Sequence, residues 1–124
     1  KNKNVYEYGY VTNDQLNAII ENSIAVISPE MYTSDNGPAT DGWARGKPVI
    51  LANIPSNREH IDKQSVYAEL FNYRDPKDIA EKIINVINNQ NKFNELAKNS
   101  KKSINKIEWF KVAEEYYKVI SKKN

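Results

Sequence analysis

The stretch that determines the fold lies at residues 24–51 and reads IAVISPEMYTSDNGPATDGWARGKPVIL. It opens on Ile24–Ile27, a continuous apolar run of strand length, and closes on a second such run at Pro48–Leu51. Runs that are apolar on both faces are typical of buried strands in a parallel sheet. Between the two runs, Pro38 suits the first turn of a helix, which we expect to extend to about Arg45. The stretch therefore predicts one strand–helix–strand unit.

The same alternation of strands and helices continues on both sides of this unit. In chain order we expect a strand at Val5–Tyr8, a helix from Thr12 or Asn13 to Ser23, an irregular polar segment at 52–65, a strand at Val66–Phe71, a helix that begins at Asp75–Pro76, and two further helical segments. Such alternation predicts an α/β fold. We therefore expect a single domain, residues 1–124, with a doubly wound, Rossmann-like parallel sheet of about four strands, helices on both faces and a helical C-terminal third.

Four of the predicted helices carry an apolar stripe at helical spacing, and we expect each stripe to lie in the core. The stripes are Leu16, Ile19 and Ile20; Ile79, Ile83, Ile84 and Ile87; Phe93, Leu96, Ala97 and Ile104; and Trp109, Val112, Ala113, Tyr116, Tyr117 and Ile120. A stripe of this kind indicates packing more often than a cofactor site. On the short central helix, Trp43 is expected to be a packing residue as well.

The composition excludes several classes of protein. The chain has no cysteine, which excludes disulfides and cysteine-ligated zinc, and a single histidine, which excludes a histidine-rich metal centre. We expect no metal site, and we expect that histidine, His60, to be a solvated loop residue. No apolar run approaches the roughly 18 to 20 residues that span a bilayer. A cytoplasmic location is the expectation that follows.

Charge is nearly balanced, with 18 Lys and Arg against 16 Asp and Glu, and no basic stripe indicates nucleic-acid binding. The distribution is uneven, because residues 1–74 carry a balance of −2 and residues 75–124 a balance of +4. Two interpretations of the basic C-terminal helices stay open. They contact an anionic membrane, at its inner face, or their lysines are simply solvated among glutamates and asparagines.

Ligands of a parallel α/β sheet bind beyond the carboxyl ends of the strands. The loops expected at that edge are Gly9–Thr12, Ser28–Pro38 and Ala52–His60. The middle loop is polar, contains a glycine and leads into the helix at Pro38, whose free N–H groups and positive dipole end suit a phosphate. The residues alone leave two interpretations open, a phosphate site or a well-capped loop.

The middle loop and its helix also carry a longer pattern. Residues 29–50, PEMYTSDNGPATDGWARGKPVI, align without a gap to P-S-l-y-E-G-f-G-l-P-x-l-E-A-m-a-x-G-x-P-V-I. Residues 52–61, ANIPSNREHI, are similar to A-s-d-I-P-x-x-R-E-v, and residues 69–83, ELFNYRDPKDIAEKI, to l-F-d-p-x-D-P-x-d-l-A-e-k-I. Over nearly its whole length the chain thus resembles the C-terminal, donor-binding domain of GT-B-fold retaining glycosyltransferases of the large group 1, or family 4, type.

The resemblance implies a function and a set of site residues. Enzymes of this kind move a sugar from a nucleotide-diphosphate sugar to a saccharide or lipid-linked acceptor, with no further cofactor. Asp41 stands where the family binds the donor ribose, and Thr33 stands where a glutamate contacts the transferred sugar, which makes Thr33 the catalytic position. By the same correspondence, the diphosphate is expected at Ser34, Asp35, Asn36, Gly37 and Pro38, the base at Gly9 and Tyr10, and further loop contacts at Arg58 and Glu59.

The resemblance also implies what this chain lacks. In the family, two further strands and a basic Arg–Lys pair precede the strand expected at Val5–Tyr8, and a separate domain binds the acceptor. The sheet is therefore expected to be partial, with an open edge. We expect either a fragment, completed by an N-terminal part of the same protein, or a self-dimer. The isolated 124 residues are expected to be inactive.

Two other classes of function were weighed. Thr33 in place of a glutamate favours a non-catalytic nucleotide-sugar or saccharide binding module as the alternative. A receiver-like signalling domain fits the length and the alternation, but it needs an acidic pair after the first strand and a phosphorylatable aspartate after the third. Tyr8–Tyr10 and Ala52–Ile54 stand at those places, which argues against it.

Overall fold

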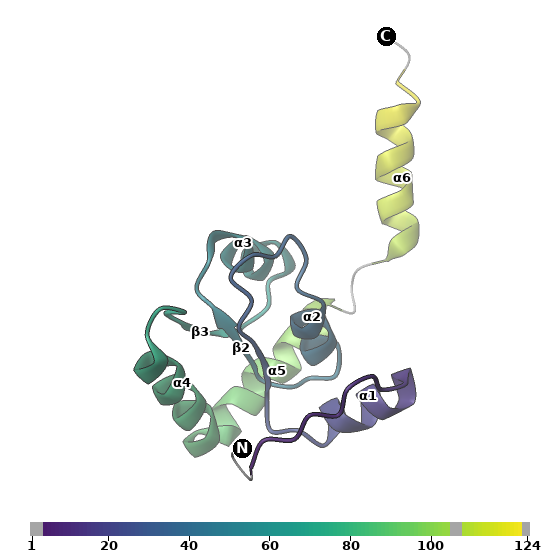
Figure 1. Ribbon diagram of the computed structural model, residues 1–124. Helices are drawn as coiled ribbons and strands as arrows, with labels where there is room; N and C mark the ends of the chain where they lie inside the picture. Colours follow the sequence, from purple (N-terminus) through teal and green to yellow (C-terminus); the bar gives the residue numbers. More distant parts are fainter. Residues whose placement is uncertain (1–3, 105–107, 123–124) are drawn as a thin grey trace.

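The computed structural model describes residues 4–104 and 108–122. Within them lie three strands and six helices: α1 (Asn13–Glu21), β1 (Val26–Ser28), α2 (Gly37–Ala44), β2 (Val49–Ala52), α3 (Pro55–Gln64), β3 (Glu69–Phe71), α4 (Pro76–Asn88), α5 (Gln90–Ile104) and α6 (Trp109–Ile120). The predicted α/β fold is confirmed (Figure 1).

The three strands form one parallel sheet in the order β1-β2-β3. Ile50 of the central strand pairs with Ile27 on one side and with Glu69 on the other. All four residues of β2 are buried, as expected for the middle of a parallel sheet that is covered on both faces. Because parallel strands need crossover connections, α2 links β1 to β2 and α3 links β2 to β3.

Alternate residues of β2 point to opposite faces of the sheet, and each face has its own core. On one face, Val49 and Leu51 pack with Ala39 and Trp43 of α2. The other face has a separate cluster: Ile50, Ala52, Ile54, Phe71, Val86 of α4 and Phe93 of α5. α5 contributes to both clusters, because its last residue, Ile104, belongs to the first cluster. Helices therefore cover both faces, as predicted.

Local capping chemistry fixes where the helices begin and end. Thr12 caps α1 through a capping box with Gln15, in which each side chain bonds the other residue's backbone N–H. Asp75 caps α4 by accepting from the Lys77 N–H at 2.9 Å, and Pro76 occupies the first helical position. Gly46 follows the end of α2 with φ +67, a left-handed conformation that favours glycine.

The strand predicted at Val5–Tyr8 is wrong. Residues 4–12, the described part of the chain before α1, contain no strand, and Val5, Tyr6 and Tyr8 are exposed. The sheet therefore has three strands where about four were predicted. β-propensity describes how a residue fits a half-buried pleated surface, and a short run has no such surface without a paired neighbour.

One edge of the sheet is open as a consequence. Ile27 lies in β1 and Ile24 lies just before it, and both side chains are about half exposed. Between this edge and α4 lies an apolar groove of about 230 Å³, lined by Ile24, Ala25, Ile27, Ile50, Ile83, Val86 and Ile87.

The segment 52–65, predicted to be irregular, contains a ten-residue helix, α3. Pro55 begins this helix at its first position, where its missing N–H costs nothing, rather than breaking it. The helix ends at Ser65, whose φ of 52 places a non-glycine residue in the left-handed region. The following strand is correspondingly shorter than predicted, since β3 covers Glu69–Phe71 only.

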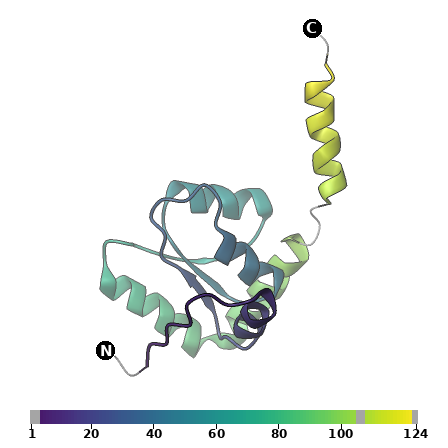
Figure 2. The same ribbon diagram turned by 45° about the vertical axis from the view of Figure 1, so that its right-hand side comes forward.

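The predicted burial of the apolar stripes holds for some helices and fails for others. α5 buries Phe93, Ala97 and Ile104. In α1 only Ile20 is buried. In α4 the predicted Ile79 and Ile83 are partly buried and pack against the second cluster, whereas Ile84 and Ile87 are exposed. α6 buries none of its residues, and it lies apart from the rest of the chain in both views (Figures 1 and 2). Amphipathic spacing shows that a helix has a face suited to burial, but not that a surface is present to cover it.

Among the described residues, no helix is long and apolar enough to cross a membrane.

Candidate functional site

The candidate site lies where β1 ends and α2 begins. β1 ends at Ser28, the loop runs through residues 29–36, and Gly37 opens the helix. This is the carboxyl edge of a parallel sheet, the edge at which such folds bind ligands. Thr33, Ser34, Asp35, Asn36, Gly37 and Pro38 all lie on this one connection, and Asp41 lies one helical turn further on.

Asn36 holds this loop in place. It is 2% exposed, and its side-chain oxygen caps α2 by accepting from the Ala39 N–H at 3.2 Å. Its amide Nδ2 donates to Oδ1 of the buried Asn57 at 3.2 Å, and Asn57 donates in turn to the Ala52 carbonyl at 2.8 Å. The amide pair therefore ties the β1–α2 loop to the end of β2 and to the first turn of α3.

This capping limits how α2 can hold an anion. The Ala39 N–H is taken by Asn36, the Thr40 N–H donates to the Asn36 carbonyl at 3.0 Å, and Pro38 has no N–H. Gly37 is left as the residue of the first turn whose N–H finds no acceptor among the described residues. A phosphate here would therefore depend on the loop backbone before Gly37 as much as on the helix itself.

Thr33 takes part in the shape of the loop. Its Oγ1 donates to the Asp35 carbonyl at 2.6 Å, a local turn of the kind that threonine hydroxyls form. Ser34, which lies between the two bonded residues, and Asp35 are both exposed. A hydroxyl in this place is neutral, so Thr33 brings no charge to the site.

Asp41 is held by a neighbouring arginine. Arg45 Nη1 donates to Asp41 Oδ1 at 2.8 Å and to the Asp41 carbonyl at 2.9 Å. Arg45 Nη2 donates to Oδ1 of Asn17 on α1. Neither Arg45 nor Asn17 was predicted as a site residue, and their contact joins two helices whose packing the sequence does not reveal.

Arg58 and Glu59 lie on the first turns of α3 and not in a loop. Arg58 Nη1 donates to Asn53 Oδ1 at 2.5 Å. Glu59 pairs with Lys63 at 2.5 Å, and this ammonium lowers the pKa of the Glu59 carboxyl below its ordinary value. The two residues therefore have separate partners and do not form an ion pair with each other.

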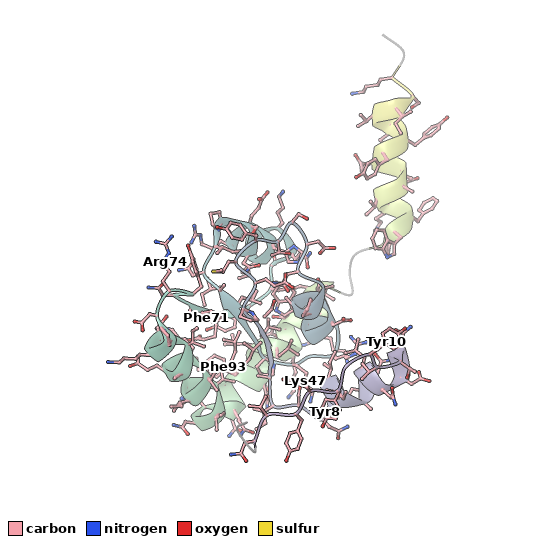
Figure 3. All side chains as sticks on the ribbon, viewed as in Figure 1. Tyr8, Tyr10, Lys47, Phe71, Arg74 and Phe93 are labelled. Atoms are coloured by element: carbon pink, nitrogen blue, oxygen red, sulfur yellow. The ribbon has the colours of Figure 1, made fainter. Side chains whose placement is uncertain are left out.

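Gly9 and Tyr10 precede α1, on the segment that was predicted to follow a strand. Gly9 has φ +63, which favours glycine, and Tyr10 is 97% exposed. Tyr8 and Tyr10 project from the outside of the molecule (Figure 3). The sequence predicted that a strand at residues 5–8 would end at the carboxyl edge of the sheet and place Gly9 and Tyr10 there. Residues 5–8 form no strand, so this reason for placing Gly9 and Tyr10 at the edge does not hold.

His60 is a packing residue, so its predicted place in a solvated loop is wrong. Its ring stacks on Trp43, with centroids 5.4 Å apart and an angle of 25° between the planes. Trp43 is 0% exposed and donates from Nε1 to the Tyr67 carbonyl at 2.8 Å, which confirms its predicted packing role.

Sequence reasoning missed two further polar residues near the site, Asn57 and Ser28. Asn57 was missed because it lies in the segment 52–65, which was predicted to be irregular although it contains α3. Ser28, the last residue of β1, is 2% exposed, and its Oγ has no hydrogen-bond partner in the described part of the chain. As for metals, the described residues contain no group of three His, Cys, Asp or Glu side chains that could hold an ion.

The fold is thus an α/β domain in which a polar, glycine-containing loop and a carboxylate-bearing helix lie at the carboxyl edge of a parallel sheet, the edge at which such folds bind ligands. The chain belongs to the family described as glycosyl transferases group 1, which matches residues 1–103. Comparison with curated proteins and with solved structures gave no match. The family resemblance predicted from the sequence is therefore confirmed, and the matched residues extend from the N-terminal segment almost to the end of α5.

Proposed function

We propose that this glycosyltransferase domain binds a nucleotide-diphosphate sugar at the β1–α2 connection. The diphosphate would lie against the backbone of residues 34–37, the ribose hydroxyls against Asp41, and the base toward Gly9 and Tyr10. The sugar would pass, with retention of its anomeric configuration, to a saccharide or lipid-linked acceptor. The observation that carries the proposal is the position of Asp41, a carboxylate one helical turn from Gly37 on the helix that the loop leads into.

Two features of the geometry support the contacts proposed for the diphosphate and the ribose. One turn of α-helix rises about 5.4 Å, so a ligand group at Gly37 and another at Asp41 are neighbours within one nucleotide. The Asn36–Asn57 pair holds the loop at the start of α2 before any ligand arrives. A loop held in this way would present its free backbone N–H groups to a leaving diphosphate without reorganising, and such stabilisation of charge is the largest contribution that many enzymes make to transfer chemistry.

One observation favours the alternative, a non-catalytic module that binds nucleotide sugars or saccharides. Thr33 carries no charge, and its hydroxyl is already bonded to the Asp35 carbonyl. Such a module would keep the donor site and lack turnover. Thr33→Glu in a full-length protein discriminates between the two, because it would raise sugar transfer in an enzyme whose reaction centre needs the carboxylate, and would leave a binding module without turnover.

The donor site is tested by calorimetric titration of the chain with UDP, GDP and their diphosphate sugars. We expect one nucleotide to bind, and Asp41→Ala to weaken that binding strongly while leaving it measurable. Asp62→Ala is the matched control, since Asp62 is an exposed aspartate near the end of another helix, α3. Equal binding by the Asp41→Ala variant, or no binding of any nucleotide to the unaltered chain, would contradict the proposal.

A further inference from the structure

Arg45 makes contacts that an ordinary helix-surface ion pair does not make. The pair with Asp41 has i,i+4 spacing, which on an exposed helix is worth only about 0.3–0.5 kcal/mol. Here, however, the same guanidinium also donates to the Asp41 carbonyl and to Asn17 of α1. The side chains of Arg45 and Asp41 are 22% and 41% exposed, so the contact is partly withdrawn from water.

These three contacts determine the orientation of the Asp41 carboxylate. Arg45 Nη1 donates to both Oδ1 and the backbone carbonyl of Asp41, and these two bonds fix the direction in which the carboxylate faces. Oδ2 is left without a hydrogen bond from the described residues. A planar guanidinium is suited to this role because its donors are fixed relative to one another, unlike the rotating ammonium of a lysine.

Asn17 fixes the other end of the guanidinium. Its Oδ1 accepts from Arg45 Nη2, and within the described residues it is the α1 side chain that bonds to another element. Asn17 is half-buried and neutral. It therefore restrains Arg45 without competing with Asp41 for the positive charge, as an aspartate or glutamate would at that position.

The charge of Arg45 has a second consequence for an anionic ligand. Asp41 and the exposed Asp35 both lie on or beside the connection proposed to hold a diphosphate. Two carboxylates close to a diphosphate would repel it. Because Arg45 neutralises Asp41, the carboxylate can accept hydrogen bonds from ribose hydroxyls without adding net negative charge beside the phosphates.

We propose that Arg45 and Asn17 are positioning residues for Asp41, holding its Oδ2 toward the ribose hydroxyls of the bound nucleotide. This inference rests on the proposed function, since it assigns a task to residues around the donor site. It predicts that ribose recognition depends on the guanidinium and on its amide partner more strongly than general nucleotide affinity does.

The test compares each ribonucleoside diphosphate with its 2′-deoxy counterpart, UDP with dUDP or GDP with dGDP, by calorimetry on the chain. Arg45→Met keeps the length of the stem and removes the donors. We expect it to weaken binding of the ribonucleotide about tenfold and that of the 2′-deoxynucleotide less, because the deoxynucleotide loses the charge neutralisation of Asp41 but has no 2′-hydroxyl contact to lose. Asn17→Ala should give a smaller loss with the same preference, and Arg45→Lys an intermediate one. Lys63→Met is the matched control, because Lys63 pairs with Glu59 at the same i,i+4 spacing on α3.

A double-mutant cycle shows whether Arg45 acts through Asp41. In the Asp41→Ala background, Arg45→Met should cause no further loss of affinity. An equal loss for both nucleotides, an undiminished loss in the Asp41→Ala background, or no loss at all would overturn the inference. If Arg45→Met does not fold, the comparison of the ribonucleotide with its 2′-deoxy counterpart is made with Asn17→Ala instead. Where Asp41→Ala itself leaves binding unchanged, the proposed donor site fails first. Where Asp41→Ala weakens binding and the Arg45 and Asn17 variants do not, only the positioning role fails.

Discussion

α2 and α6 show opposite relations between sequence pattern and burial. α2 has eight residues, GPATDGWA, with two glycines, a proline and only a weak apolar stripe, yet it buries Ala39, Gly42 and Trp43. α6 has twelve residues, WFKVAEEYYKVI, with a strong stripe, yet it buries none of them. In Figure 3 the side chains of α6 extend into open space on all sides. The comparison teaches that connectivity, and not periodicity, decides which helix is buried.

The reason lies in what each helix connects. α2 joins two adjacent parallel strands, and such a crossover packs back onto the sheet whatever its own pattern. The contact is close because Gly42 has no side chain: a Cβ there would lie 2.8 Å from Val49 Cγ2 and 3.2 Å from Val26 Cβ. α6 follows the last helix of the sheet domain and connects to no strand among the described residues, so nothing in the topology holds it to the sheet.

The two tryptophans give the largest expected difference. Trp43 of α2 is 0% exposed and Trp109 of α6 is 80% exposed. We expect Trp43→Ala to lower the free energy of unfolding by about 3–5 kcal/mol, because it removes a large core side chain and leaves a cavity. Trp109→Ala should change it by less than about 0.5 kcal/mol, as for an ordinary surface substitution. Urea unfolding followed by circular dichroism measures both, and similar losses would refute the contrast between the helices.

The buried amide pair gives the next largest effect. Asn57→Ala would leave the buried Asn36 amide without its acceptor and would remove one of the two donors to the Ala52 carbonyl, which keeps the Ile54 N–H at 2.9 Å. Because a buried polar group without a hydrogen bond carries its full desolvation cost, we expect a loss of about 1–3 kcal/mol. Asn94→Ala, at an exposed position of α5, is the control and should be near neutral. If the two variants unfold at the same urea concentration, Asn57 does not hold the loop.

Tyrosines allow the same comparison through pH. Tyr67 stands just before β3. Its hydroxyl donates to Glu69 Oε2 at 2.7 Å, and burial, followed by that bond and the carboxylate's charge, raises its pKa to about 12. A raised pKa means that folding favours the protonated phenol. Its stabilising contribution is therefore complete below the ordinary pKa of 10, and it is lost as the pH rises from about 10 to 12.

We expect the free energy of unfolding to fall over that pH interval by more in the unaltered chain than in Tyr67→Phe. Tyr116→Phe, on the exposed α6, should follow the unaltered chain, since Tyr116 is 69% exposed. Urea unfolding at several alkaline pH values measures the difference. Parallel pH profiles for the unaltered chain and Tyr67→Phe would show that the Tyr67–Glu69 contact does not persist in solution.

The same distinction explains how much of the fold could be predicted from the sequence. The strand–helix–strand unit at residues 24–51 was predicted correctly, because two buried apolar runs and a proline at a helix start are local signals. Residues 5–8 were predicted wrongly as a strand, and Pro55 was read as part of an irregular segment although it begins α3. Both errors concern tertiary context. A strand needs a neighbour, and a proline is compatible with either a break or a helix start.

The candidate site divides along similar lines. Its loop and Asp41 were predicted as donor-binding residues because they occur in one ordered run of sequence. Asn57 and Asn17 were missed because each acts through a contact far along the chain, Asn57 with Asn36 and Asn17 with Arg45. Neither contact has a local pattern. A hydrogen bond between side chains 28 residues apart depends on how α1 packs. The spacing of α1's own residues does not predict that packing.

The smallest expected effect is the sharpest test of the comparison between α2 and α6. We expect a chain that ends after Ile104 to unfold at the same urea concentration as the whole chain, with the same cooperativity. α6 contributes no buried residue, and its ion pairs, Lys111 with Glu108 and Lys118 with Glu115, are exposed and local. Such pairs are worth about 0–1 kcal/mol to the helix and nothing to the sheet. The family match also ends at residue 103, before α6 begins.

A lower midpoint in the shortened chain would mean that the apolar face of α6 docks on the sheet domain in solution. Trp109 fluorescence distinguishes that result from a change confined to the end of α5. In the whole chain, acrylamide should quench Trp109 readily and the buried Trp43 poorly, and Trp43→Phe isolates the Trp109 signal. A protected Trp109 together with a lower midpoint would place α6 with α2 among the packed helices. An accessible Trp109 and an unchanged midpoint would show that a well-patterned helix here contributes nothing to the stability of the fold beside it.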